Sequence, residues 1–223
     1  MEMNNDPRYV RVRGQLCDAA RRLALTKPAD SITVAELTRE AGVSRTTFYQ
    51  HGDSPAQFVA DMVVDVLQPY LDELIDAVAT PNENYLLRWR ETYVRMLTEL
   101  REHREFLSTL FAPNQPVVVG HITRRLALIF DAYVDEFTSH LREETVSNLW
   151  TAMATTQQVY NLIAVLVAWL GTDMKESPDV VVNTYLSLAP PWQLARFQDD
   201  GTVSLRRLRA ISDIAAGARG RKL

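Results

Sequence analysis

Residues 33–51 read TVAELTREAGVSRTTFYQH and predict two short helices joined by a tight turn. Thr33 and Glu36 have the spacing of a capping box, in which each side chain pairs with a free backbone amide of the other residue. Gly42 stands where a helix usually ends on a left-handed residue. Ser44 then caps another helix that runs to the end of the stretch. This order is typical of a helix-turn-helix, whose second helix enters the major groove of DNA.

A helix that begins after Ser44 directs Val43 and Phe48 inward by its periodicity. The outward-facing side chains, which form the candidate DNA surface, are Arg45, Thr46, Tyr49 and Gln50. Arg45 has the two donors for a bidentate contact with guanine, and the Gln50 amide has the donor and the acceptor for a bidentate contact with adenine. Thr46 offers a hydroxyl to a phosphate or a methyl group to thymine.

The string Ala41–His51 resembles the recognition segment of the TetR family of bacterial regulators. The resemblance is sharp over residues 10–65, and beyond them the chain agrees in architecture only. It implies that Thr33, Ser44 and Tyr49 mainly bind phosphates. Such contacts fix the position of the protein along the DNA but do not select a base sequence. His51 is expected to do likewise or to cap locally. The complete set of predicted DNA-binding residues is Thr33, Ser44, Arg45, Thr46, Thr47, Tyr49, Gln50 and His51.

Two positions depart from the family pattern. Gly52 stands where the family usually has an aromatic residue, and Pro55 stands where it often has a lysine that meets a phosphate. Pro55 suits the first turn of a helix, and Ser54 and Gln57 have the spacing of a second capping box. We therefore interpret these changes as altered DNA affinity rather than lost function.

Apolar periodicity predicts helices along the whole chain and no run of alternating strands. The expected fold is all-α, with about nine to ten helices. Residues 1–53 form the helix-turn-helix head, and residues 54–223 form a larger body for ligand binding and dimerisation. The expected helices span residues 10–25, 33–41, 44–51, 55–78, 86–100, 106–111, 122–137, 145–170 and 178–189. Residues 192–223 are left unassigned.

The helix expected over residues 145–170 has a seam of side chains that repeats in alternating steps of four and three, as in a packed helix pair. The seam residues are Leu149, Met153, Thr156, Tyr160, Ile163, Val167 and Leu170. The second half of this helix is apolar on every side, so one face is expected to meet its own core and the other a partner subunit. We therefore expect a homodimer formed through residues 145–170 and 178–189.

The net charge of −4 is unevenly distributed. Residues 1–50 carry +2, residues 51–190 carry −10 and residues 191–223 carry +4. Because an acidic surface repels phosphates, only the small head is expected to touch DNA. Charge alone also fits a solvated surface without a DNA partner. The basic residues Arg206, Arg207, Arg209, Arg219, Arg221 and Lys222 either add nonspecific DNA affinity or stay solvated.

The N-terminal residues lack the apolar core of a signal peptide, and a cytoplasmic location is expected. The single cysteine, Cys17, excludes an intramolecular disulfide framework. The longest nearly pure apolar run, 159–170, is shorter than the roughly 20 residues of a membrane span. We therefore expect no membrane partner.

The family resemblance also implies that the body encloses a pocket for a small-molecule effector that releases a repressor from its operator. The candidate ligand-binding residues are Trp89, Tyr93, His121, Phe130, Trp150, Gln157, Tyr160 and Asn161. Plain core packing is the competing interpretation for each aromatic residue among them. The chain contains no HExxH, P-loop, GxGxxG or GxSxG motif, so neither an enzyme nor a cofactor or metal site is expected. The alternative function is a helical protein-interaction adaptor that has lost sequence-specific DNA binding.

Overall fold

The computed structural model describes residues 6–82, 84–113, 115–141, 146–194, 197 and 201–203. The all-α prediction is confirmed, since these residues form helices and no named strand. The elements are α1 (Pro7–Ala24), the short 3-10 turn η2 (Ala29–Ser31), α2 (Val34–Ala41), α3 (Arg45–Phe48), α4 (Pro55–Ala79), α5 (Tyr85–Glu102), α6 (Arg104–Leu110), α7 (Pro116–Ser139), α8 (Asn148–Gly171) and α9 (Pro178–Leu188).

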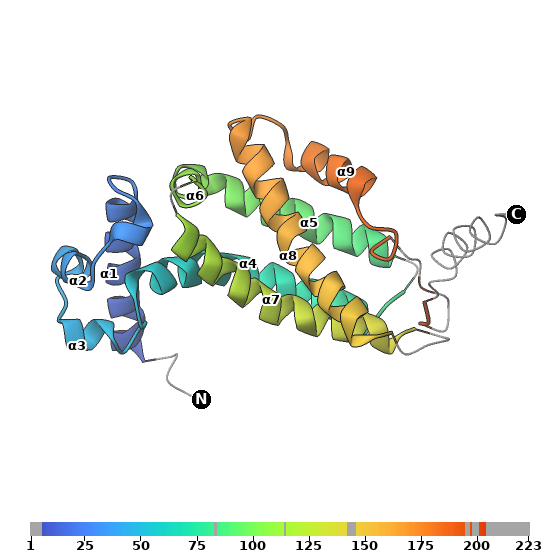
Figure 1. Ribbon diagram of the computed structural model, residues 1–223, viewed down its shortest axis with the longest axis horizontal. Helices are drawn as coiled ribbons and strands as arrows, with labels where there is room; N and C mark the ends of the chain where they lie inside the picture. The colour runs from blue at the N-terminus through green and yellow to red at the C-terminus, as the bar shows by residue number, and fades with distance from the viewer. Residues whose placement is uncertain are drawn as a thin grey trace, which may run out of the picture.

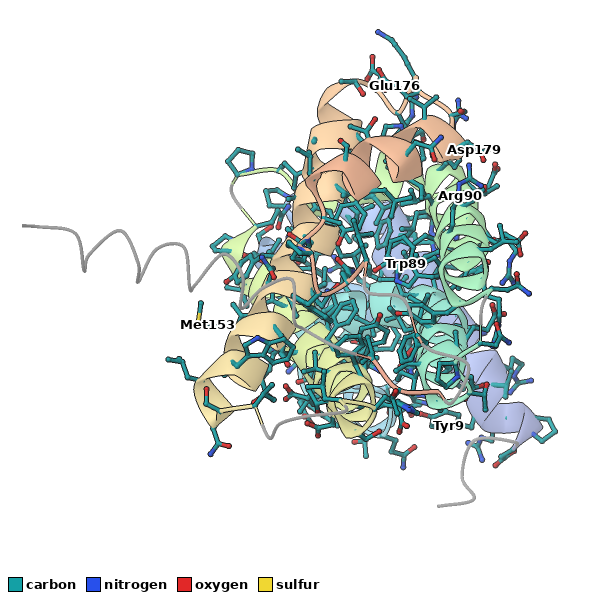
Figure 2. The ribbon with its side chains drawn as sticks, turned by 90° about the vertical axis from the view of Figure 1, so that its right-hand side faces the viewer. Tyr9, Trp89, Arg90, Met153, Glu176 and Asp179 are labelled. Carbon is teal, nitrogen blue, oxygen red and sulfur yellow. The ribbon has the colours of Figure 1, made fainter. Side chains whose placement is uncertain are left out.

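Helices α1 to α3 form a head at one end of the molecule, and α4 leads from the head into the body (Figure 1). In the body, α4 and α7 pack along each other, and α5 and α8 flank this pair. The side chains agree with this arrangement of the helices. Trp89 of α5 points among the helices, whereas Met153 of α8 points away from the body (Figure 2).

Several helix ends differ from the sequence-based expectation. Helix α7 differs most, since it begins at Pro116 rather than residue 122. Helix α1 begins at Pro7 rather than residue 10, because Asp6 caps it by accepting the Arg8 amide at 2.8 Å. Helix α3 ends at Phe48 rather than near His51. The His51 amide donates to the Phe48 carbonyl at 2.7 Å. This bond spans three residues instead of four, so the chain leaves the α-helix in a tighter turn.

Some sequence-based expectations fall outside the described residues. The predicted start of the eighth helix at residue 145 is one of them, and the described helix α8 begins after its cap, Ser147. The basic positions between residues 206 and 222 are another.

Candidate nucleic-acid interface and ligand site

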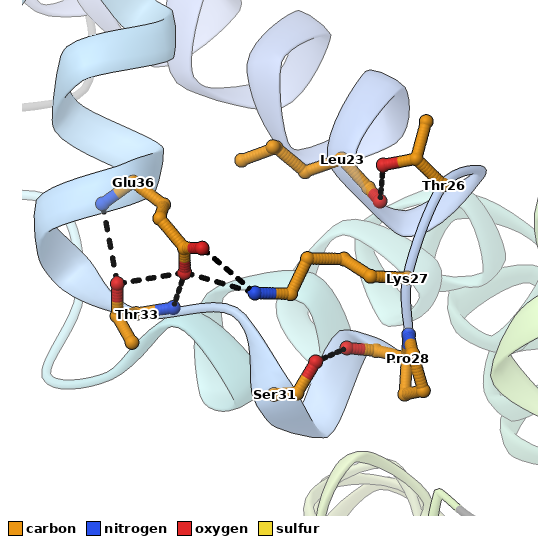
Figure 3. Close-up of polar contacts among 7 residues, drawn as sticks. All are labelled: Leu23, Thr26, Lys27, Pro28, Ser31, Thr33 and Glu36. Atoms are coloured by element: carbon orange, nitrogen blue, oxygen red, sulfur yellow. Dashed lines mark hydrogen bonds and ion pairs between the residues drawn. The ribbon is translucent and has the colours of Figure 1, made fainter.

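The start of α2 is held by the predicted capping box (Figure 3). The Glu36 amide donates to the Thr33 hydroxyl at 3.2 Å, and the Glu36 carboxylate accepts the Thr33 amide at 2.9 Å and its hydroxyl at 2.7 Å. Lys27 donates to both oxygens of the same carboxylate, at 2.9 and 3.0 Å. The Lys27 hydrogen bond, followed by those of Thr33, lowers the pKa of Glu36 to about 2. The carboxylate is therefore ionised and paired at neutral pH.

The turn after α2 forms as the sequence predicts. Gly42 adopts the left-handed region with φ at +67°, which a residue with a Cβ rarely occupies. Ser44 then caps α3 by accepting the Thr47 amide at 3.0 Å. These two residues set the direction in which α3 leaves α2.

The candidate DNA surface lies on the outside of α3. Phe48 is fully buried and its ring packs edge-on against that of Phe58 at a centroid distance of 6.1 Å. The side chains of Arg45, Thr46 and Gln50 are exposed and make no hydrogen bond or ion pair with any residue that the structure describes. Tyr49 is 58% exposed. The recognition segment thus has one buried anchor and four side chains free for an external partner.

The hydroxyl groups of three predicted DNA-binding residues, Thr33, Ser44 and Thr47, are partly engaged inside the head. The Thr33 hydroxyl donates its hydrogen to Glu36, and the Ser44 and Thr47 hydroxyls lie 2.8 Å apart and share one hydrogen bond. A phosphate needs donors, because it is itself an acceptor. Of these three residues, Thr33 has no side-chain donor left to offer.

His51 lies apart from these exposed side chains, which disfavours the phosphate contact that was one of its two expected roles. Its side chain is only 8% exposed and its ring stacks on Tyr9 of α1 with centroids 4.1 Å apart. The tightening after Phe48 turns His51 toward α1. Its buried Nδ1 has no hydrogen-bond partner among the described residues. His51 therefore joins α1 to the end of α3.

The eight candidate ligand-binding residues do not line one pocket. Trp89 and Tyr93 of α5 are buried, and they stack with centroids 3.9 Å apart. Tyr185 of α9 stacks on both rings, and its hydroxyl accepts a hydrogen bond from Asn161 of α8 at 3.3 Å. Tyr93, Tyr185 and Asn161 line a cavity of about 10 Å³, which is roughly the space that one water molecule needs.

The remaining candidates lie elsewhere. Trp150, Gln157 and Tyr160 line an open surface hollow of about 500 Å³ on α8, together with Trp192. Phe130 is buried against Tyr133 in the core of the body, and half-buried His121 is within 3.2 Å of Arg124 on α7.

A chain of buried polar groups beside the small cavity had no sequence signal. The Tyr185 hydroxyl donates to Gln193 at 2.5 Å, and Gln193 donates to Gln158 at 2.8 Å. Gln158 is 1% exposed, and its Nε2 has no partner among the described residues. Nothing in the spacing of these residues indicates that they meet. Among the described residues, no group of three or more His, Cys, Asp or Glu could hold a metal ion.

The predicted seam of α8 lies on the outer face of the body. Met153 is 63% exposed and Tyr160 is 60% exposed, and Leu149 and Val167 extend the same apolar stripe. The opposite face, which is buried in the body, consists of Ala154, Thr155, Gln158, Val159, Leu162, Leu166 and Trp169. By length and composition alone, α8 is the one described helix that could cross a membrane.

Two family models match the chain. Residues 16–58 match the model described as bacterial regulatory proteins, tetR family. Residues 88–190 match the model described as transcriptional regulator C-terminal region. The chain belongs to the TetR family. The resemblance seen in residues 41–51 is thereby confirmed.

Relatives of this TetR-family chain are distant. An uncharacterized HTH-type transcriptional regulator of Bacillus subtilis (strain 168), YxbF, is 26% identical over 165 residues. That match covers 71% of this chain and 40% of the relative, so the chain spans less than half of the relative's length.

Solved structures share the fold of the TetR-family chain. A TetR-family regulator from Syntrophomonas wolfei is 11% identical with a TM-score of 0.56, covering 79% of this chain and 92% of its own. The fatty acid degradation regulator FadR from Bacillus halodurans is 16% identical with a TM-score of 0.53, covering 83% and 95%. SmeT, the repressor of the Stenotrophomonas maltophilia efflux pump SmeDEF, is 16% identical with a TM-score of 0.52, covering 79% and 89%.

The departure of this TetR-family head at Gly52 has a local physical reason. A Cβ built on Gly52 would lie 3.3 Å from the Phe58 ring, which is tighter than ordinary contact. Phe58 of α4 thus occupies the space next to Gly52 and packs on Phe48. At the start of α4, Ser54 accepts the Gln57 amide at 3.2 Å, which is one of the two bonds of the predicted capping box, and Pro55 occupies the first turn.

Sequence reasoning missed the first turns of α1 as part of the recognition end of the TetR-family head. Because Tyr9 stacks on His51, the beginning of α1 lies beside the end of α3. Arg8 and Arg11 are exposed in this part of α1. The basic character of residues 8–13 is the sequence feature that could have indicated Arg8 and Arg11. Their position near α3, however, follows only from the contact between Tyr9 and His51.

We expect the head to lose stability in mild acid through His51. Burial, aided by the positive charge of Arg13, lowers the pKa of His51 below its ordinary value of about 6.5. Unfolded chains therefore bind a proton that the folded head resists, and the free energy of unfolding falls as the pH drops through about 6.5. Urea unfolding at pH 7.5 and 5.5 measures the free energy of unfolding of the wild type and of His51→Phe. We expect the wild type to lose more of it at pH 5.5 than the variant does. An equal loss in both proteins would contradict the assignment.

Proposed function

We propose that this TetR-family chain is a ligand-responsive transcription regulator, a repressor that leaves its operator when a small-molecule effector binds. The observation that carries the proposal is the outer face of α3. There Arg45, Thr46 and Gln50 are exposed and unpaired, while Phe48 anchors the segment in the head. Polar side chains of this kind, at the second helix of a helix-turn-helix, suit direct reading of base edges.

The uneven distribution of charge supports separate functions for the head and the body. The head, residues 1–53, contacts DNA, and the acidic body, residues 54–223, binds the effector and a second copy of the chain. Arg8 and Arg11 at the start of α1 supply phosphate contacts beside α3, which offset the missing lysine at Pro55. A DNA-binding regulator works in the cytoplasm, where its operator is.

The second copy covers the outer face of α8. An isolated apolar stripe of this length in water is unfavourable, and a two-fold interface covers the same stripe on both copies. Val180 and Leu188 of α9 are exposed and extend the surface available to the partner. The arrangement supports a homodimer through α8 and α9, which places two heads on one operator.

The effector binds between α5, α8 and α9. The residues lining the small cavity are all uncharged, namely Tyr93, Leu97, Asn161, Leu162, Val165, Val181, Val182 and Tyr185. A charged molecule would lose its hydration there without an ionic partner, so the effector is neutral and partly aromatic. The cavity of about 10 Å³ must widen to admit it. On the surface, Arg90 of α5 pairs with Asp179 of α9 at 2.8 Å and joins these two helices (Figure 2).

Selection of binding sites from a randomised duplex library, followed by fluorescence anisotropy at two salt concentrations, tests the proposal. We expect one enriched sequence of two half-sites, bound more tightly than scrambled DNA and weakened by salt because phosphate contacts release counterions. Failure to enrich any sequence would reject the DNA-binding function and favour the adaptor, which needs no operator.

The same assay serves to find the effector. A library of neutral and charged compounds is screened for release of the operator and for a raised unfolding temperature. Releasing compounds that are all charged would contradict the neutral site between α5, α8 and α9.

A further inference from the structure

We infer that Asp30 is a positioning residue that holds the head in a defined orientation on the body. Asp30 lies in η2, the short turn between α1 and α2. Its carboxylate accepts the backbone amides of Val117 and Val118, each at 2.8 Å. Those amides belong to the first turn of α7, 87 and 88 residues further along the chain.

This contact is a helix cap supplied by another segment. Helix α7 begins with Gln115 at its N-cap position, and the Gln115 side chain makes no capping bond to α7 itself. Pro116 has no amide hydrogen, so Val117 and Val118 carry the first free donors of the helix. Both donors are taken by Asp30, and its negative charge suits the positive end of the helix dipole.

The contact is also reciprocal. The Asp30 amide donates to the Gln115 side-chain oxygen at 2.9 Å, and Gln115 is buried. Each partner therefore satisfies the other's backbone amides, as in a capping box, but the two halves come from the head and the body. Breaking this contact removes the direct hydrogen bonds between η2 and α7 and leaves two amides of α7 without an acceptor.

A second polar link joins the head to α7 by way of α4. Arg13 of α1 pairs with Asp65 of α4, and Arg125 of α7 contacts Asp65 at 3.4 Å and Asp61 at 2.8 Å. The Arg13 guanidinium also lies 5.4 Å from the centre of the Phe58 ring. Since Phe58 packs on Phe48, the link from α7 reaches the anchor of the recognition helix. Helix α7 thus contacts the head through two separate polar links.

The consequence for DNA binding rests on the proposed function. Two heads must meet successive major grooves about 34 to 36 Å apart, so the operator selects one head orientation. A head without the Asp30 contact is held to α7 by the Asp65 link alone, so it occupies that orientation for a smaller fraction of the time and the apparent affinity falls by that fraction.

The decisive comparison is between Asp30→Ala and the double variant Asp30→Ala/Gln115→Ser. A serine at the N-cap position of α7 can accept the amide of Val118 itself, so the double variant restores a cap to α7 but not the contact with the head. Asp53→Ala is the matched control, because it removes an exposed head carboxylate that has no hydrogen bond to any described residue.

Head orientation is measured by pulsed electron paramagnetic resonance. Spin labels are placed on Asp18→Cys in the head and Glu102→Cys in the body, both exposed, in a Cys17→Ser background. Labelled chains are diluted with unlabelled ones so that only distances within one chain are seen. We expect both Asp30 variants to broaden this distance distribution and to bind the selected operator about tenfold more weakly, as loss of a charge-assisted contact implies.

Two results would overturn the inference. One is an unchanged distance distribution in Asp30→Ala. The other is recovery of wild-type distances and affinity in the double variant, which would reduce Asp30 to a cap of α7. If the distances broaden but wild type binds no operator, the positioning role stands and the proposed function fails.

Discussion

Replacing Arg45 with alanine is expected to abolish specific operator binding while leaving the fold intact. The side chain is exposed and has no partner among the described residues, so its loss removes no internal contact. A bidentate contact with guanine contributes about 1 to 3 kcal/mol to discrimination at each half-site. A dimer carries the change twice, which amounts to roughly 2 to 6 kcal/mol, or about thirtyfold to about 25,000-fold.

Arg101→Ala is the matched control for this prediction. Arg101 is an exposed arginine near the end of α5, so its replacement removes the same charge at a position in the body. Fluorescence anisotropy with the selected operator and with scrambled DNA gives both affinities. Equal losses in the two variants would mean that Arg45 contributes only nonspecific charge, and an unchanged preference in Arg45→Ala would remove Arg45 from base recognition.

Replacing Met153 with glutamate should convert the dimer into monomers. Met153 points away from its own body and lies on the apolar stripe of α8 (Figure 2). At a two-fold interface the substitution buries two unpaired carboxylates, each of which costs on the order of 3 to 5 kcal/mol. Sedimentation at micromolar concentration measures the mass directly. The monomer should keep its helical content, because Met153 contributes little to the internal core.

Two further variants make this result specific. Met153→Leu keeps an apolar side chain of similar volume and should remain dimeric. Arg101→Glu introduces a carboxylate on the exposed side of α5 and should also remain dimeric. A Met153→Glu protein that still sediments as a dimer would show that the partner covers another face.

The helix-turn-helix could be predicted from sequence because its signals are local. Thr33 and Glu36 are three residues apart, and Gly42 determines the turn through its own backbone conformation. The direction of Phe48 follows from helical periodicity alone. The position of the His51 side chain does not follow from such local signals. The helix ends three residues before it, and contact with Tyr9, 42 positions earlier, decides where the ring lies.

The seam of α8 was likewise readable, since it depends on spacing within one helix. The ligand site was not. Spacing placed Trp89 and Tyr93 on the apolar face of one helix, but it could not show that Tyr185 stacks on both or that Trp150 and Tyr160 lie in a separate surface hollow. Which aromatic residues meet depends on how helices pack, and several packings share one apolar pattern.

Local sequence signals were enough to predict the helices, the caps of α2, α3 and α4, and the outer face of α3, because these depend on backbone hydrogen bonds and side chains within about four residues of each other. The tertiary structure alone decided that Asp30 caps α7 and that Phe58 fills the space beside Gly52. Such contacts join segments whose separation along the chain carries no periodic signal. Their partners are chosen by the packing of whole helices, which brings one unsatisfied group within reach of another.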